Sequence, residues 1–154
     1  MVRCKSDSRL SSINTKVILT QTDTTVGFVS QNHSKLARIK SRPHTKAFIK
    51  IYDSLYSLQT RIPQNKKNLL RRSKKTTFVV KNRAFRIDKN YKNSQILRDL
   101  KWHYSTSANE MGKKFNREYC VDKTDIIIED KNGLNELSAS KLLKINSYKI
   151  RSLR

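Results

Sequence analysis

Short apolar segments, each bounded by polar residues, constrain the fold of this chain more than any other feature. Segments rich in β-branched and aromatic residues favour buried strands, and they predict strands at 17–20, 47–51, 76–80, 84–87, 102–104, 125–128, 142–145 and 148–150. Apolar residues at helical spacing predict short helices at 65–72, through Leu55 and Leu58, and after the candidate N-caps Ser34 and Ser94. This mixture indicates an α/β or α+β domain around one twisted sheet.

The length of 154 residues is typical of one domain with a core large enough to fold alone. We expect residues 1–12 to form a flexible basic arm and residues 13–154 to form the domain. No apolar run approaches the length of a membrane span, and the charged N-terminus does not resemble a secretory signal. Two cysteines, Cys4 and Cys120, are too few for a disulfide framework or a four-ligand zinc site. We therefore expect a cytoplasmic protein with no membrane partner.

The charge of the chain is strongly unbalanced. Thirty-four Lys and Arg residues face twelve Asp and Glu residues, which gives a formal net charge of +22. Between Thr24 and Ile87 the only acidic residue is Asp53. A positive field of this kind attracts phosphates and polyanions. Glycine and proline are scarce while lysine and asparagine abound, so codon bias and solubility explain the charge equally well, and both interpretations stay open.

Several common chemistries are absent from the sequence. With only three glycines there is no Gly-rich phosphate loop and no dinucleotide fingerprint. The three histidines, His33, His44 and His103, lack metal-ligand spacing, and no pair of carboxylates suggests acid–base catalysis. We therefore predict no metal site and no tightly bound cofactor. Any bound nucleotide would be held largely by side chains.

Three polar segments could form a site for a small anionic ligand. They are Thr22-Asp23-Thr24-Thr25 with Gly27, Lys40-Ser41-Arg42-Pro43 with Lys46, and Ser105-Thr106-Ser107-Ala108-Asn109 with Gly112. Hydroxyl and amide groups suit ribose and phosphate oxygens, while lysine and arginine suit polyphosphate. Taken singly, each segment fits a plain turn or a solvated face equally well.

Taken in order, these segments resemble the YrdC-like (Sua/YciO/YrdC/YwlC) threonylcarbamoyl-AMP synthase family. Its members carry Pro-Thr-Asp/Glu-Thr followed by Tyr-Gly, then Lys-x-Arg-Pro, then Thr-Ser-Ala-Asn-x-x-Gly. The resemblance covers about residues 16–151 and includes weaker matches at 77–80, Arg86, Ala139-Ser140 and Arg151. The chain departs from the pattern at Gln21, at Val26, at the Ser73-Lys74-Lys75 segment in place of Pro-Gly-Pro, and after Arg151.

The resemblance implies a single YrdC-like domain with a twisted mixed sheet, short helices and a basic concave face. It also implies a nucleotidyltransferase that joins L-threonine, bicarbonate and ATP into L-threonylcarbamoyladenylate and releases pyrophosphate. Mg²⁺ would accompany the ATP. Partner proteins would then transfer the threonylcarbamoyl group to tRNA, which gives threonylcarbamoyladenosine.

The resemblance further implies roles for individual residues. Lys40 and Arg42 would act in catalysis by offsetting the charge that develops as pyrophosphate leaves. The residues expected to bind ATP are Lys40, Arg42, Lys46, Thr77, Ser107, Asn109 and Arg151. Those expected to bind threonine are Thr22, Thr24 and Ser140.

Two other functions remain open from the sequence. The first is a non-catalytic protein of the same fold that binds double-stranded RNA or tRNA, as family members have been described to do. The predicted contact residues for RNA are Arg71, Arg72, Lys74 and Lys75. The second is a small basic protein that associates with ribosomes or binds DNA.

Overall fold

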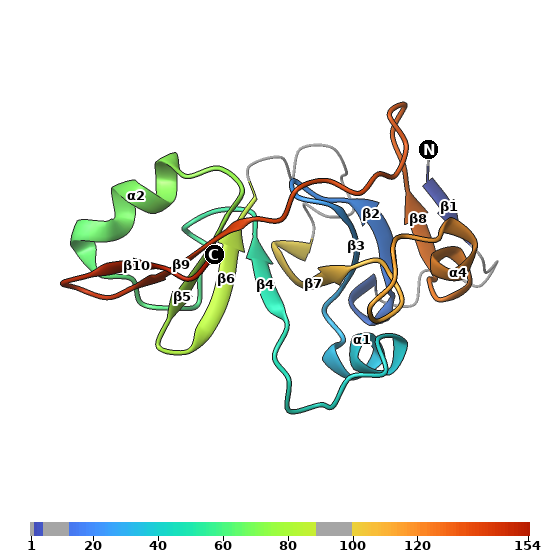
Figure 1. The fold of residues 1–154 in the computed structure, drawn as a ribbon, viewed down its shortest axis with the longest axis horizontal. Helices are drawn as coiled ribbons and strands as arrows, with labels where there is room; N and C mark the ends of the chain where they lie inside the picture. The colour runs from blue at the N-terminus through green and yellow to red at the C-terminus, as the bar shows by residue number, and fades with distance from the viewer. Residues whose placement is uncertain (1, 5–12, 89–99) are drawn as a thin grey trace.

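The computed structural model describes residues 2–4, 13–88 and 100–154. Within these ranges ten strands form one mixed sheet, in the order β1-β8-β2-β3-β7-β4-β6-β5-β9-β10 (Figure 1). The strands are β1 Val2–Cys4, β2 Ile18–Gln21, β3 Val26–Ser30, β4 Ile49–Tyr52, β5 Thr76–Val80, β6 Arg83–Ile87, β7 Trp102–Ser107, β8 Ile126–Ile128, β9 Lys141–Ile145 and β10 Ile150–Ser152. The described helices are η1 Ile13–Thr15, α1 His33–Ile39, η2 Gln64–Lys66, α2 Lys67–Arg72 and α4 Arg117–Asp122. The predicted α/β class with a mixed sheet and short helices is confirmed.

The sheet has apolar side chains on both faces because successive residues of a strand point to opposite sides. On one face, Leu19 and Phe28 pack against residues of α1 and α4, and further along the sheet Phe85 packs with Leu70 of α2. On the other face, Ile18, Val29 and Ile51 form a separate cluster. Burial of each such large side chain stabilises the fold by about 1.5–3 kcal/mol.

A long connection crosses the molecule from β8 to β9, past the ends of the central strands (Figure 1). Leu134 anchors this connection in the core beneath α1 and α4. Its Asn135 accepts a hydrogen bond from the backbone N of Val26 and donates one from its own backbone N to Gln21 Oε1. The connection therefore links the two halves of the sheet and borders the loop between β2 and β3.

Some predicted elements differ from the structure. The helix through Leu55 and Leu58 is wrong, because Ser54 Oγ accepts the backbone N of Ser57 and the segment folds into turns. Helix α1 begins at His33, since Asn32, not Ser34, caps it through a hydrogen bond from Lys35 N to Asn32 Oδ1. The helix predicted after Ser94 lies largely outside the described residues.

Other strands extend or add to the predicted set. The predicted set contains no strand at 26–30 and no helix at 117–122, where β3 and α4 lie. Strand β7 continues through Ser107, beyond the strand predicted at 102–104 and into the polar segment that follows it. In the predicted arm, Val2–Cys4 pairs antiparallel with β8, whereas residues 5–12 lie outside the described ranges. No helix in the described ranges is long and apolar enough to cross a membrane.

Candidate functional site

Parts of the three polar segments predicted from the sequence meet beside the central strands β3 and β7. Strand β3 pairs with β7 so that Gly27 stands opposite Ser107. The backbone N of Ala108 then donates to the carbonyl of Val26 at 3.0 Å. A Cβ at Gly27 would lie 3.1 Å from the carbonyl oxygen of Thr106 and 3.1 Å from Thr22 Cγ2. Glycine is needed here because the β2–β3 loop and the end of β7 approach each other closely.

Lys40, Ser107 and Asn109 form one hydrogen-bonded cluster. Lys40 caps the C-terminus of α1, and its Nζ donates to Ser107 O at 3.1 Å and to Asn109 Oδ1 at 3.0 Å. It also donates to the carbonyl of Asn109. Ser107 Oγ donates to Asn109 Oδ1 at 2.7 Å, and Asn109 Nδ2 donates to Lys113 O at 2.6 Å. A cation, a hydroxyl and an amide are thus held together, a set of groups that suits a phosphate ester.

Burial shifts the pKa values of Lys40 and of the neighbouring Cys120. Lys40 is only 8 % exposed. Its burial, together with the nearby charge of Arg42, lowers the pKa of the Lys40 ammonium. Cys120 of α4 donates its Sγ hydrogen to the carbonyl of Ala108, and burial raises the pKa of that thiol. The cysteine therefore supports the 107–109 turn as a neutral packing group.

The β2–β3 loop is held mainly by its own threonines. Thr22 Oγ1 donates to Thr25 O at 2.6 Å and accepts the backbone N of Thr24 at 3.3 Å and of Thr25 at 3.2 Å. Thr24 Oγ1 lies 3.3 Å from Thr22 Oγ1 and accepts Arg86 Nη1 at 2.9 Å. The hydroxyl of Thr22 therefore shapes the loop, while Thr24 connects it to β6.

Arg86, which is not among the predicted site residues, forms a buried ion pair with Asp23. Its Nη1 lies 3.1 Å from Asp23 Oδ1, and the two side chains are 5 % and 8 % exposed. Burial lowers the pKa of Arg86 and raises that of Asp23, although each charge partly offsets the shift of the other. Among the described residues, Arg86 Nε and Asp23 Oδ1 are buried without a hydrogen-bond partner. A lone arginine between the apolar residues Phe85 and Ile87 was the sequence signal for this position.

His103 lies on the same face of the sheet as Arg86. Both stand opposite Ile51, Arg86 from β6 and His103 from β7. Burial, with a smaller contribution from the charge of Arg86, lowers the pKa of His103 to about 3. The imidazole is therefore neutral at neutral pH.

Thr77 of β5 and Ser140, the residue before β9, contact each other. Their hydroxyl oxygens are 2.9 Å apart, and both residues are buried. Phe78 pairs with Phe85, and continuing that register places Thr77 opposite Arg86, on the same face. Arg154 Nη2 donates to Ser140 O at 3.1 Å. Thr77, predicted to bind ATP, and Ser140, predicted to bind threonine, are therefore in direct contact.

Three predicted site residues, Arg42, Lys46 and Arg151, do not join the Lys40 cluster, the Arg86 ion pair or the Thr77–Ser140 contact. The Arg42 guanidinium lies 5.0 Å from the centre of the Phe48 ring, and Lys46 is exposed. Arg151 is exposed on the edge strand β10, with β9, β5, β6 and β4 between β10 and β7. The C-terminal arginine that reaches Ser140 is Arg154, three residues further on.

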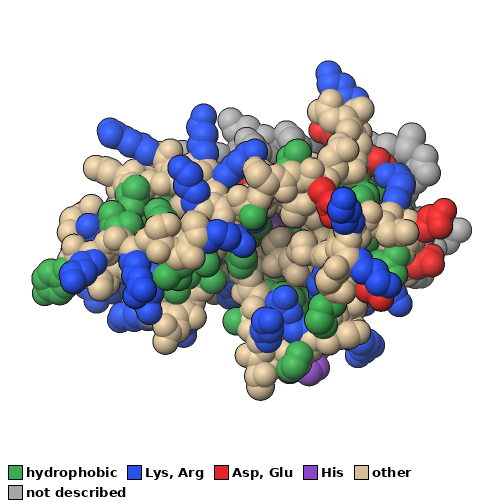
Figure 2. All heavy atoms as spheres, in the orientation of Figure 1, with side chains coloured by type: hydrophobic (Ala, Val, Ile, Leu, Met, Phe, Trp, Pro, Cys, Tyr) green, Lys and Arg blue, Asp and Glu red, His purple; other side chains and the backbone are tan. Residues whose placement is uncertain are grey.

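The acidic residues of the molecule gather toward one end. Residues 54–87 and 137–154 contain no Asp or Glu, but they contain ten Lys and Arg in the first range and five in the second. Figure 2 shows blue side chains over both ends of the molecule, whereas red ones gather over the end formed by α4 and β8. The predicted RNA contacts Arg71, Arg72, Lys74 and Lys75 are all exposed at the basic end.

The described residues contain no group of three or more His, Cys, Asp and Glu side chains placed to hold a metal ion. What the site offers is hydroxyl, amide, ammonium and guanidinium groups. These groups can bind and orient an anionic ligand, and they can stabilise charge that develops on it.

Comparisons with known proteins identify the fold. No protein-family model matches the chain, and no curated protein sequence matches it significantly. Among solved structures, it is similar to P. abyssi Sua5 complexed with L-threonine, at 19% identity and a TM-score of 0.70, over 90% of this chain and 50% of that one. It is also similar to E. coli YciO, at 16% identity and a TM-score of 0.67, over 90% of this chain and 82% of that one.

A third similar structure is full-length HypF in its phosphate- and nucleotide-bound form. The identity is 11% and the TM-score 0.70, over 100% of this chain and 25% of that one. The chain spans about half the length of the Sua5 structures it matches. The resemblance to YrdC-like proteins that the motifs indicated is confirmed at the level of the fold.

Proposed function

We propose that this chain belongs to the YrdC-like family and makes L-threonylcarbamoyladenylate for the threonylcarbamoyladenosine modification of tRNA. The observation that carries the proposal is the cluster of Lys40, Ser107 and Asn109. The β2–β3 loop carries Thr24, which contacts the buried Arg86, and strand β3, which follows this loop, pairs with Ser107 of the cluster. The fold is shared with a Sua5 complexed with L-threonine.

The reaction has two steps. The amine of L-threonine first attacks the carbon of bicarbonate, and loss of water leaves a carbamate on the nitrogen. An oxygen of this carbamate then attacks the α-phosphorus of ATP, and the bond to the β-phosphate oxygen breaks, so that pyrophosphate leaves with its electron pair. Neither step needs a covalent protein intermediate, so positioning and electrostatic stabilisation supply the catalysis.

The nucleotide would lie at the Lys40 cluster. Ser107 and Asn109 would donate to and accept from its sugar and phosphate oxygens. Lys40, released from its backbone acceptors, and Arg42 would contact the triphosphate, with Lys46 further out. Arg151, on the edge strand β10, would act on the nucleotide only at long range. Because burial lowers the pKa of Lys40, an anionic ligand that brings negative charge next to it would favour its protonated form. Mg²⁺ would arrive with ATP and supply charge neutralisation on the phosphates.

Threonine would lie toward β6. Thr24 and Ser140 offer hydroxyls, and Thr22 holds the loop that carries Thr24. The Arg86 guanidinium, whose Nε is buried without a hydrogen-bond partner, is the group we expect to bind the threonine carboxylate. His103 would stay neutral and add no competing charge.

The test is pyrophosphate release by the purified chain with ATP, Mg²⁺ and bicarbonate, with and without L-threonine. We expect release that depends on threonine, and we expect Lys40→Ala to lower the rate by about 10²–10³ because a donor to the transition-state charge is lost. Lys131→Ala, an exposed lysine outside the site, is the control and should keep the parental rate. Equal rates in Lys40→Ala and Lys131→Ala would refute the assignment of the site.

A second candidate function is binding of double-stranded RNA or tRNA without synthesis. The acid-free end of the molecule favours it, because fifteen basic residues there face no acid within their own segments. A folded protein that releases no pyrophosphate but binds RNA through this end would favour the second function over the first.

A further inference from the structure

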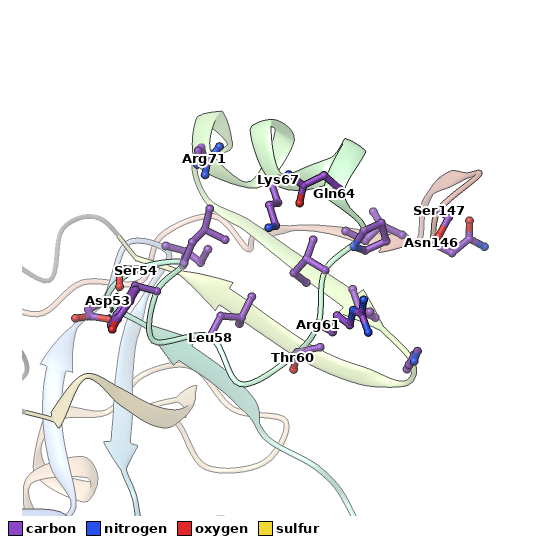
Figure 3. A pocket seen from close by; sticks show the side chains of 18 residues that line it. Asp53, Ser54, Leu58, Thr60, Arg61, Gln64, Lys67, Arg71, Asn146 and Ser147 are labelled. Atoms are coloured by element: carbon purple, nitrogen blue, oxygen red, sulfur yellow. Dashed lines mark hydrogen bonds between the residues drawn. The ribbon is translucent and has the colours of Figure 1, made fainter.

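A pocket opens at the basic end of the molecule, between α2, the segment that follows β4, the β5–β6 hairpin and the β9–β10 turn (Figure 3). Its volume is about 1270 Å³. The apolar part of its wall consists of Leu55, Leu58, Ile62, Val80, Ile87 and Ile145. Several of these side chains belong to the core cluster beneath α2, so the wall is part of the packed fold.

Basic side chains surround this apolar wall. Those that line the pocket are Arg61, Lys67, Arg71 and Lys81. In Figure 3, Lys67 points from α2 toward the strands, and Arg61 lies across the opening from it. The only acid among the lining residues is Asp53, which lies beside Ser54 at the other end. The four cations make the potential at the Lys67 end positive, which favours an anion there.

The rest of the lining suits a ligand with an apolar body. Tyr56 is fully exposed at the pocket, so its ring can stack on a flat group. Inorganic phosphate could reach the cations but would leave the apolar wall in contact with water. A ring or short chain next to the anionic group would cover the wall and gain the free energy of that burial.

The pocket is separate from the proposed synthase site. Val80 and Ile87 belong to the cluster packed beneath α2, whereas Thr77 and Arg86 occupy alternate positions of the same strands and point to the opposite face. None of the residues placed in the synthase site lines the pocket.

We propose that this pocket is a second binding site, for a small organic anion that joins a ring or short apolar chain to one phosphate, carboxylate or sulfonate group. The anionic group lies at Lys67 and Arg71, and the apolar body lies against Leu58 and Ile62 beside Tyr56. This inference does not depend on the proposed synthesis.

The test is a titration of the full chain with 1-naphthyl phosphate, measured by calorimetry. Inorganic phosphate and 1-naphthol each lack one half of the ligand, and each should bind at least about tenfold more weakly, since either the burial or the charged hydrogen bonds are lost. Inorganic phosphate that binds as tightly as 1-naphthyl phosphate would refute a role for the apolar wall.

Two double variants distinguish binding in the pocket from attraction to the net positive charge of the chain. Lys67→Gln with Arg71→Gln should weaken 1-naphthyl phosphate binding by about tenfold or more. The matched control, Lys141→Gln with Lys144→Gln, removes two exposed lysines outside the pocket and should change binding less than about twofold. Tyr56→Ala alters a fully exposed ring, so a loss of binding there cannot come from unfolding.

If the two double variants lose the same affinity for 1-naphthyl phosphate, binding depends only on the net charge of the chain, and the pocket proposal is wrong. Lys40→Ala should leave 1-naphthyl phosphate binding unchanged, because Lys40 lies in the synthase site. A loss in Lys40→Ala without a loss in the Lys67 and Arg71 variant would place the anion in the synthase site instead.

Discussion

At the scale of single residues, buried polar groups distinguish this chain from a plain basic domain. Arg86, Asp23 and Thr24 are buried and are joined by one ion pair and one hydrogen bond. Buried charges are costly unless paired, so a fold retains them where they are compensated or where they serve a ligand. His103 adds a neutral imidazole that burial keeps from taking a proton.

His103 makes the stability of the protein depend on pH. Its pKa is about 3 in the folded state against 6.5 as the ordinary value, so between these values the unfolded chain binds a proton that the folded chain does not. Stability is therefore lost as pH falls below about 6.5. When the pH falls from 7 to 5, the unfolding free energy of the parent should drop by about 2 kcal/mol more than that of His103→Gln. Urea denaturation at each pH measures both values. The same loss in both proteins would show that His103 is protonated in the folded state.

At the scale of elements, the pairing of β3 with β7 positions the site. It places the β2–β3 loop against the 107–109 turn, and α1 then brings Lys40 to that turn through its C-terminus. Gly27 is the point of closest approach, because a side chain there would meet the backbone of β7.

Gly27→Ala should therefore disturb both the fold and the site. Its new Cβ would crowd the Thr106 carbonyl and Thr22, and such overpacking costs about 1–3 kcal/mol. We expect that loss of unfolding free energy in urea, together with weaker binding of ATP by calorimetry. Ala139→Gly, a small change on an exposed residue of the β8–β9 connection, is the control. Unchanged stability in Gly27→Ala would mean that β3 and β7 can separate slightly without cost.

At the scale of the whole molecule, the acidic side chains gather toward one end of the long axis, while basic side chains lie over both ends. The end built from α2, β5, β6, β9 and β10 carries no acid in residues 54–87 and 137–154, while acids gather over α4 and β8 (Figure 2). A polyanion would approach the basic end first, since long-range attraction depends on where the charges lie.

Replacement of Arg71, Arg72, Lys74 and Lys75 by Gln should lower the salt dependence of duplex RNA binding. Each lost phosphate contact removes about 0.9 from the slope of log K against log salt, so the slope should fall by up to about 3–4. The matched variant replaces Lys113, Lys114, Lys123 and Lys131, four exposed lysines near the acidic end, with the same change in charge. The slopes come from binding measured at several salt concentrations, and an equal fall in both variants would rule out a localised interface.

The sequence by itself determined the local features of this protein. Strands such as 76–80 and the short helix before them follow from side-chain preferences that act over a few residues. The order of the three polar segments also indicated the YrdC-like fold, and the structure confirms it. The residues of the Lys40 cluster were named from the sequence, because a motif preserves the order of groups along the chain.

Only the tertiary structure decided which of these groups meet. The contact of Arg86 with Thr24 joins β6 to the loop between β2 and β3, two strands that are not neighbours of β6 in the sheet. It therefore depends on strand order and on which face the Arg86 side chain takes. In the same way, Arg154 and not Arg151 reaches Ser140, because the β9–β10 turn sets the register of the last strand. Helix α4 and strand β3 are stabilised by packing and pairing with segments distant in the sequence, which local preference does not encode.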